Sequence, residues 1–180
     1  MNWINVYPGE MIYVAGGTVH TLGPGSVIVE TQQQSDTTYR LYDYGRPRPL
    51  HLERGLAAVK ERPNSGKVIR PAPSDIDGGK NRYSSMIVAP HFVVDMFELR
   101  APHEFSTCDA SGKDSVQILV AFEGCGIVEM NDHAPVTLAK GDAAVIPASA
   151  ERFTMRPQWT VEFLKACVPG KEVPEPATRL

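Results

Sequence analysis

No run of this 180-residue chain approaches the about 20 consecutive apolar residues that a membrane-spanning helix needs. The opening Met-Asn-Trp-Ile lacks the basic segment and long apolar run of a secretory signal. The net charge is -3, from 18 basic and 21 acidic residues, and no basic cluster is available to neutralise a row of phosphates. We therefore expect a soluble cytoplasmic protein that binds neither membranes nor nucleic acid.

Cysteine is also scarce. Cys108, Cys125 and Cys167 are odd in number, far apart and without Cys-x-x-Cys spacing, which predicts reduced thiols. A cysteine paired with a histidine for catalysis stays open, although a buried, unreactive thiol is the commoner case. The chain likewise contains no His-x-His, Gln-x-His or His-x-x-His sequence.

Short apolar segments separated by turn residues predict an all-β fold, with a jelly roll as the natural candidate. The expected strands are 4–7, 11–14, 26–31, 38–44, 86–88, 91–99, 116–123, 126–130, 143–146, 152–155 and 160–167. One short helix is expected between Pro49 and Pro63, because Leu52, Leu56 and Val59 have helical spacing. Prolines and glycines then predict an irregular linker, giving domains 1–60 and 83–180 joined by 61–82.

An isolated histidine marks the first of these domains. Pro8-Gly9 predicts a turn, Gly16-Gly17 permits unusual backbone angles, and His20 follows at once. The next two expected strands carry Glu30 and Arg40. Three neighbouring antiparallel strands would place His20, Glu30 and Arg40 in one pocket.

The spacing from Gly9 through Ala15 and Gly17 to His20 resembles the second conserved motif of the cupin superfamily, with alanine where proline is usual. Together with Glu30, Ser35-Asp36 and Thr38-Tyr39-Arg40, the segment resembles the type I mannose-6-phosphate isomerases of the short bacterial class. That resemblance implies a zinc-dependent isomerase that interconverts mannose 6-phosphate and fructose 6-phosphate through a cis-enediol.

The resemblance also implies roles for particular side chains. His20 matches a zinc ligand, Arg40 a catalytic residue, and Glu30 a glutamate close to the metal that supports catalysis. In an alternating strand Gln32 and Gln34 share the face of Glu30, so we expect them to contact the sugar phosphate.

The chain departs from the family in one respect. The other zinc ligands of the family, a Gln-x-His or His-x-His pair and a glutamate, lie upstream of the segment matching His20, as does a lysine that helps to hold the sugar phosphate. The chain therefore resembles the C-terminal part of a catalytic cupin followed by a degenerate second cupin. In the second cupin Arg152 takes the position of His20, and no metal is expected there. Activity of the isolated chain stays open.

Several alternatives remain at this point. His20 could be an ordinary core histidine, and Arg40 a surface arginine paired with Asp36 or Asp43. Ser35-Asp36 could be only a turn. The whole chain could be a non-catalytic sugar-binding or structural cupin module, and exposed strand edges could pair two copies into a homodimer.

Two further patterns are weaker. The tyrosines Tyr39, Tyr42 and Tyr44 could stack on a sugar or simply pack. The neighbours His103-Glu104 faintly suggest a metal pair, but they follow Pro102 in what we interpret as a loop.

Overall fold

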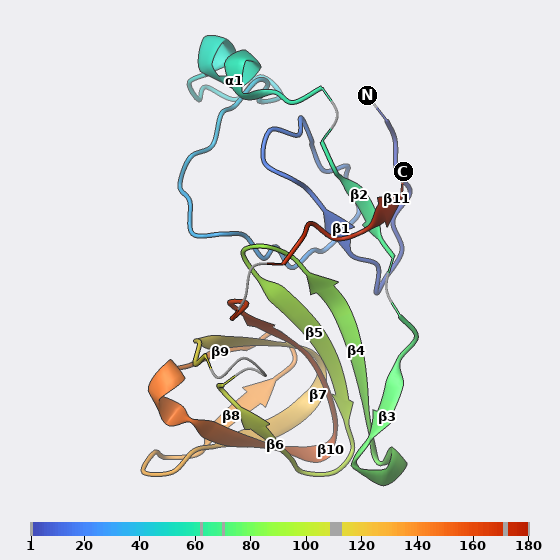
Figure 1. Cartoon of the computed structure of the whole chain (residues 1–180), viewed down its shortest axis with the longest axis vertical. Coiled ribbons are helices and arrows are strands. Elements are labelled where there is room, and N and C mark those ends of the chain that lie inside the picture. Colours follow the sequence, from blue (N-terminus) through green and yellow to red (C-terminus); the bar gives the residue numbers. More distant parts are fainter. Residues whose placement is uncertain (1, 62, 70, 109–112, 171–172, 180) are drawn as a thin grey trace. The chain divides into compact units, whose positions relative to one another are not determined.

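The computed structural model describes residues 2–61, 63–69, 71–108, 113–170 and 173–179. The chain divides into two compact units, unit 1 (residues 1–69 and 177–180) and unit 2 (residues 70–176). Unit 1 contains β1 (Ile12–Tyr13), α1 (Leu52–Ala58), β2 (Gly66–Val68) and β11 (Thr178–Arg179) (Figure 1). Unit 2 contains β3 (Ser74–Ile76), β4 (Asn81–Val88), β5 (Val93–Leu99), β6 (His103–Ser106), β7 (Gln117–Glu129), β8 (Val136–Ala139), β9 (Ala143–Ile146) and β10 (Arg152–Cys167), with 3-10 turns at Asp77–Gly79 and Ala148–Ala150.

Unit 1 is built around a three-stranded sheet in the order β1-β2-β11, with β2 antiparallel to both neighbours. Its α1 helix forms where the spacing of Leu52 and Leu56 predicted one. Gly17 permits a close approach to the end of this helix, because a Cβ there would lie 2.8 Å from the Ala58 carbonyl oxygen. Among the described residues no helix has the length and apolar character needed to cross a membrane.

Three strands predicted in unit 1 are wrong. Residues 4–7, 26–31 and 38–44 form no strand, while the prediction for 11–14 is met by the two residues of β1. Val27 is fully exposed, so the apolar segment around it is not buried against a neighbour. A strand is stable only beside a partner that completes its hydrogen-bond ladder, and the described residues offer none at these positions.

Unit 2 is an eight-stranded antiparallel sheet in the order β3-β4-β5-β10-β7-β8, with β6 also paired to β10 and β9 to β7. The first residues of β10 pair with β6 and its last residues pair with β5. β10 thus links β6 and β5 within this sheet. The predicted all-β fold class with one short α-helix is confirmed for the described residues, whose strands form sheets rather than a closed barrel.

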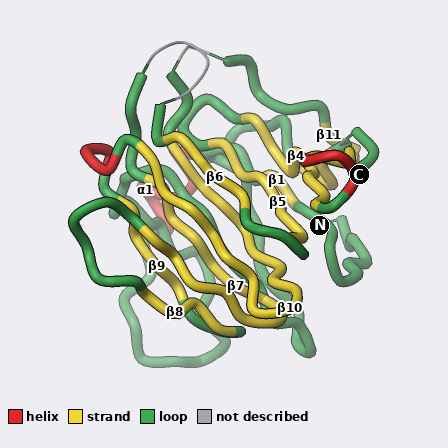
Figure 2. The backbone as a smooth tube through the Cα atoms, turned by 90° about the horizontal axis from the view of Figure 1, so that it is seen from below, coloured by secondary structure: helices red, strands yellow, loops and turns green. Residues whose placement is uncertain are grey.

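The two longest strands, β7 and β10, lie side by side (Figure 2). Each replaces two shorter predicted strands, and the break predicted between residues 123 and 126 lies inside β7. The pairing register shifts between Pro157 and Val161, opposite Gly124 and Gly126. Such a bulge lets a strand curve without ending, which a sequence pattern does not distinguish from a turn.

The core of unit 2 is an aromatic cluster enclosed by the sheet. Phe97 and Phe163 stack with ring centroids 5.6 Å apart, and Phe105 and Phe153 stack at 4.9 Å. These rings pack with Leu99, Leu119, Ala121, Val128, Leu138, Ile146, Met155 and Val161. All three cysteines belong to unit 2, and none is in a disulfide, as the sequence predicted.

Residues 61–82, predicted as an irregular linker, contain β2 and β3. Residues Thr178–Arg179, far along the chain, return to unit 1 and pair with β2. The domain limits of 1–60, 61–82 and 83–180 stay a prediction.

Candidate functional site

His20 follows a tight turn in which the Thr18 amide donates to the Ala15 carbonyl oxygen at 3.1 Å. The imidazole is exposed, and its Nδ1 lies 2.9 Å from the Thr18 carbonyl oxygen. A carbonyl oxygen only accepts, so Nδ1 carries the proton. In the neutral ring Nε2 then keeps its lone pair, which is the arrangement found in metal-ligating histidines.

Glu30, Gln32 and Gln34 lie in an exposed loop rather than on a strand face. In the described part of the chain no hydrogen bond or ion pair joins Glu30 to His20 or to Arg40. The shared face deduced from strand alternation is therefore not built here, and the roles of these residues stay predictions. Nearby, the Thr37 amide donates to Ser35 Oγ at 3.3 Å, so this serine has a turn-forming contact.

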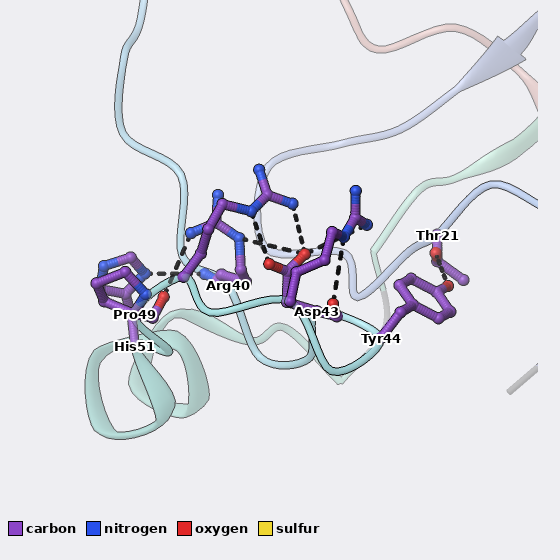
Figure 3. A network of polar contacts seen from close by, with 8 residues as sticks. Thr21, Arg40, Asp43, Tyr44, Pro49 and His51 are labelled. Atoms are coloured by element: carbon purple, nitrogen blue, oxygen red, sulfur yellow. Dashed lines mark hydrogen bonds and ion pairs between the residues drawn. The ribbon is translucent and has the colours of Figure 1, made fainter.

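Arg40 is held by contacts on its backbone and its side chain. Its amide donates to His51 Nδ1 at 3.1 Å, and its carbonyl oxygen accepts from the His51 amide at 2.8 Å. Its Nη1 donates to the Pro49 carbonyl oxygen at 3.3 Å, and its Nε lies 3.9 Å from Asp43 Oδ1 (Figure 3). The pairing with Asp43, one of the alternatives considered for Arg40, is thus present as a long ion pair.

Asp43 is the centre of a larger cluster that the sequence did not predict. Its side chain is only 5% exposed, and Arg48 donates to both carboxylate oxygens, from Nε at 2.6 Å and from Nη2 at 2.5 Å. Arg46 Nη2 lies 3.3 Å from Asp43 Oδ1. The signal that could have revealed this cluster is the run of arginines at positions 40, 46 and 48 around one aspartate.

The arginines lower the pKa of Asp43. The largest cause is the hydrogen bond from Arg48, followed by the charges of Arg46, Arg48 and Arg40, while desolvation acts in the opposite direction. The same bond raises the pKa of Arg48. The carboxylate is therefore ionised throughout the neutral range.

Acidification is expected to weaken this cluster. Because the folded-state pKa of Asp43 lies below its ordinary value of 3.8, its contribution to stability is present above that value and is lost as the pH falls through the folded-state pKa. Asp43→Asn should lower the urea midpoint of unit 1 at pH 7, and the difference from the unsubstituted chain should shrink as both are acidified. Urea unfolding followed by NMR signals of unit 1 measures this. A difference that stays constant down to strongly acidic pH would contradict it.

Exposed tyrosines lie beside the cluster. The Tyr42 and Tyr44 rings meet edge to face with centroids 5.0 Å apart, and the Tyr44 hydroxyl is 2.5 Å from Thr21 Oγ1. Tyr39 instead meets the His51 ring at 6.3 Å. Tyr42 and Tyr44 thus offer accessible ring surface close to Asp43, and sugar stacking by these rings stays a prediction.

The residues present do not complete a zinc site. Across the described ranges no group of three or more His, Cys, Asp or Glu side chains is placed to hold a metal ion. A zinc site needs three or four protein ligands, and His20 supplies one.

The weak metal pair suggested in unit 2 is not formed. His103 and Glu104 lie in β6, not in the loop expected after Pro102. His103 Nδ1 is 2.7 Å from Asp77 Oδ2, whereas Glu104 accepts from Arg152 at 2.6 Å. Neighbouring strand residues point to opposite faces, which separates the two side chains. Arg152, at the position matching His20, forms a surface ion pair with Glu104.

The chain is similar in sequence to several sugar-phosphate isomerases. It is 31% identical over 150 residues to the mannose-6-phosphate isomerase of Streptococcus mutans, which covers 80% of this chain and 44% of that protein. A segment of 63 residues is 48% identical to the mannose-6-phosphate isomerase ManA of Bacillus subtilis, covering 32% of this chain and 20% of ManA. This chain is a relative of the mannose-6-phosphate isomerases. It spans about half the length of the curated relatives it matches.

The fold agrees with that relationship. The crystal structure of the mannose 6-phosphate isomerase from Bacillus subtilis superimposes with a TM-score of 0.56 and 23% identity, over 73% of this chain and 40% of that one. No protein-family model matches the chain.

Proposed function

We propose that this relative of the mannose-6-phosphate isomerases contributes to the interconversion of mannose 6-phosphate and fructose 6-phosphate in the cytoplasm. The sequence identity with named isomerases over most of the chain carries the proposal. The reaction moves a proton between C1 and C2 through a cis-enediol, and a fixed guanidinium stabilises the negative charge that develops on the sugar oxygens. Arg40, anchored to Pro49 and His51, is suited to that role.

Supporting roles are proposed for the other predicted residues. His20 presents a free Nε2 and would serve as one ligand of a zinc ion. The remaining ligands would come from another polypeptide or from a second copy of this chain paired through exposed strand edges. Glu30 would support catalysis, and Gln32 and Gln34 would contact the sugar phosphate.

A second candidate is a non-catalytic sugar-binding or structural cupin module. The lack of any three-ligand group among the described residues favours it. The two candidates differ in whether mannose 6-phosphate is turned over.

An isomerase assay with added zinc, together with metal analysis of the same sample, tests the proposal. We expect Arg40→Lys to lower kcat about 100-fold or more, because a displaced donor no longer reaches the developing charge. His20→Ala should remove both bound metal and activity. The matched control is His91→Ala, which removes an exposed histidine from unit 2 and should leave both unchanged. No turnover with or without zinc would overturn the proposal in favour of the non-catalytic module.

A further inference from the structure

Three guanidinium groups of unit 1 approach a single carboxylate oxygen. Arg48 Nη2, Arg46 Nη2 and Arg40 Nε lie 2.5, 3.3 and 3.9 Å from Asp43 Oδ1. A tight turn brings Arg46 there, since its amide donates to the Asp43 carbonyl oxygen at 3.0 Å and its Nε donates to the same oxygen at 3.3 Å. The carboxylate therefore fixes where all three positive charges lie.

The cluster has an excess of positive charge. One carboxylate neutralises one of the three guanidinium groups, which leaves two uncompensated charges close together. Within the described residues no other carboxylate forms an ion pair with these arginines. One arginine is enough to form a structural ion pair with Asp43. The two additional guanidinium groups repel each other, and a second anion bound beside them would relieve this repulsion.

The cluster also keeps unused hydrogen-bond donors in reach of solvent. Nη1 of Arg46 and Nη1 of Arg48 have no hydrogen-bond partner among the described residues. The Arg46 and Arg48 side chains are 60% and 49% exposed, whereas Asp43 is 5% exposed. Contacts with the protein fix one side of each guanidinium group. Arg48 donates to the buried Asp43 through Nε and Nη2, and Arg46 lies over the Tyr44 ring with its Cζ 5.8 Å from the ring centroid. Their outer edges face solvent.

We propose that Arg46 and Arg48 bind the phosphate group of a sugar phosphate, and that Asp43 is the residue that positions them. A phosphate monoester carries between -1.5 and -2 charges at about pH 7, which matches the two uncompensated positive charges. Planar guanidinium groups bind phosphate oxygens through paired hydrogen bonds. The identity of the ligand as a sugar phosphate rests on the proposed function, whereas the affinity for phosphate does not.

Calorimetric titration of the chain with mannose 6-phosphate, mannose and inorganic phosphate tests the proposal. Mannose 6-phosphate should bind at least tenfold more tightly than mannose. Arg46→Gln and Arg48→Gln should each weaken mannose 6-phosphate binding about tenfold or more, because each removes charge-assisted hydrogen bonds. Arg54→Gln removes an arginine from the α1 helix of the same unit and should change the affinity less than twofold. Equal binding of mannose and mannose 6-phosphate, or unchanged affinity in both cluster variants, would overturn it.

The Asp43→Asn variant distinguishes a positioning role of Asp43 from an effect of the cluster's net charge alone. The substitution makes the cluster more positive, so charge alone predicts tighter phosphate binding. A positioning role predicts weaker binding, about tenfold, because the arginines are no longer held toward the ligand. Tighter binding in a folded Asp43→Asn variant would refute the positioning role. Should the variant fail to fold, the exposed Arg46 and Arg48 variants still decide whether phosphate binds here.

The outcomes also distinguish this inference from the proposed isomerase function. Phosphate binding that depends on Arg46 and Arg48, in a chain without turnover, would support the phosphate site and reject catalysis. Turnover that is sensitive to Arg40→Lys but not to Arg46→Gln or Arg48→Gln would support the isomerase and reject the phosphate site.

Discussion

Replacing Phe163 with alanine is expected to destabilise unit 2 by about 3–5 kcal/mol. The ring is fully buried at the centre of the aromatic cluster. It stacks on Phe97 at an interplanar angle of 19° and meets Phe105 edge to face at 72°. Removing it takes apolar surface out of contact and leaves a cavity that rigid neighbouring rings fill poorly. The urea midpoint and the slope of unfolding would give the change in free energy.

The same strand offers a matched control substitution for Phe163→Ala. Trp159 belongs to β10 and is 90% exposed, so Trp159→Ala removes a larger ring without opening a cavity. We expect it to change the stability by less than about 0.5 kcal/mol. Similar losses in Phe163→Ala and Trp159→Ala would show that the aromatic cluster does not dominate the stability of unit 2.

Gly124→Ala should be about as damaging, with a loss on the order of 3 kcal/mol or more from combined backbone strain and steric overlap. Gly124 has a φ of +72°, and a Cβ there would lie 1.9 Å from the Thr160 carbonyl oxygen. The Cβ position is fixed by the backbone of β7, and the Thr160 oxygen belongs to the backbone of β10, so a rotamer change cannot relieve the overlap. The β7–β10 pairing must shift at its bulge, and thermal unfolding of unit 2 would report the loss.

Gly141→Ala is the control for backbone strain alone. Gly141 has a φ of +91°, but a Cβ there would have no neighbour within 4 Å. We expect about 1–2 kcal/mol, the usual cost of a left-handed conformation with a side chain. Equal losses at Gly124 and Gly141 would mean that the close approach of Thr160 relaxes at little cost.

The candidate site could be predicted from the sequence only in part. The resemblance identified His20, Glu30 and Arg40 as residues of interest because a motif depends on residue types and spacing. The arginines near Asp43 are visible in the sequence, but which of them reach its carboxylate depends on which side chains a turn brings to one buried oxygen. Burial changes the weight of such contacts, because a carboxylate removed from water needs partners that an exposed one does not.

Local periodicity and turn residues were enough to predict the all-β class, one short helix between Pro49 and Pro63, and the strand at 143–146. Which apolar segments became strands depended on long-range pairing. Residues 26–31 have the composition of a strand but no pairing partner among the described residues, while residues on both sides of Gly124 continue as one strand because β10 pairs along both. Strand formation depends on hydrogen bonds to distant segments, and that information lies outside any local pattern.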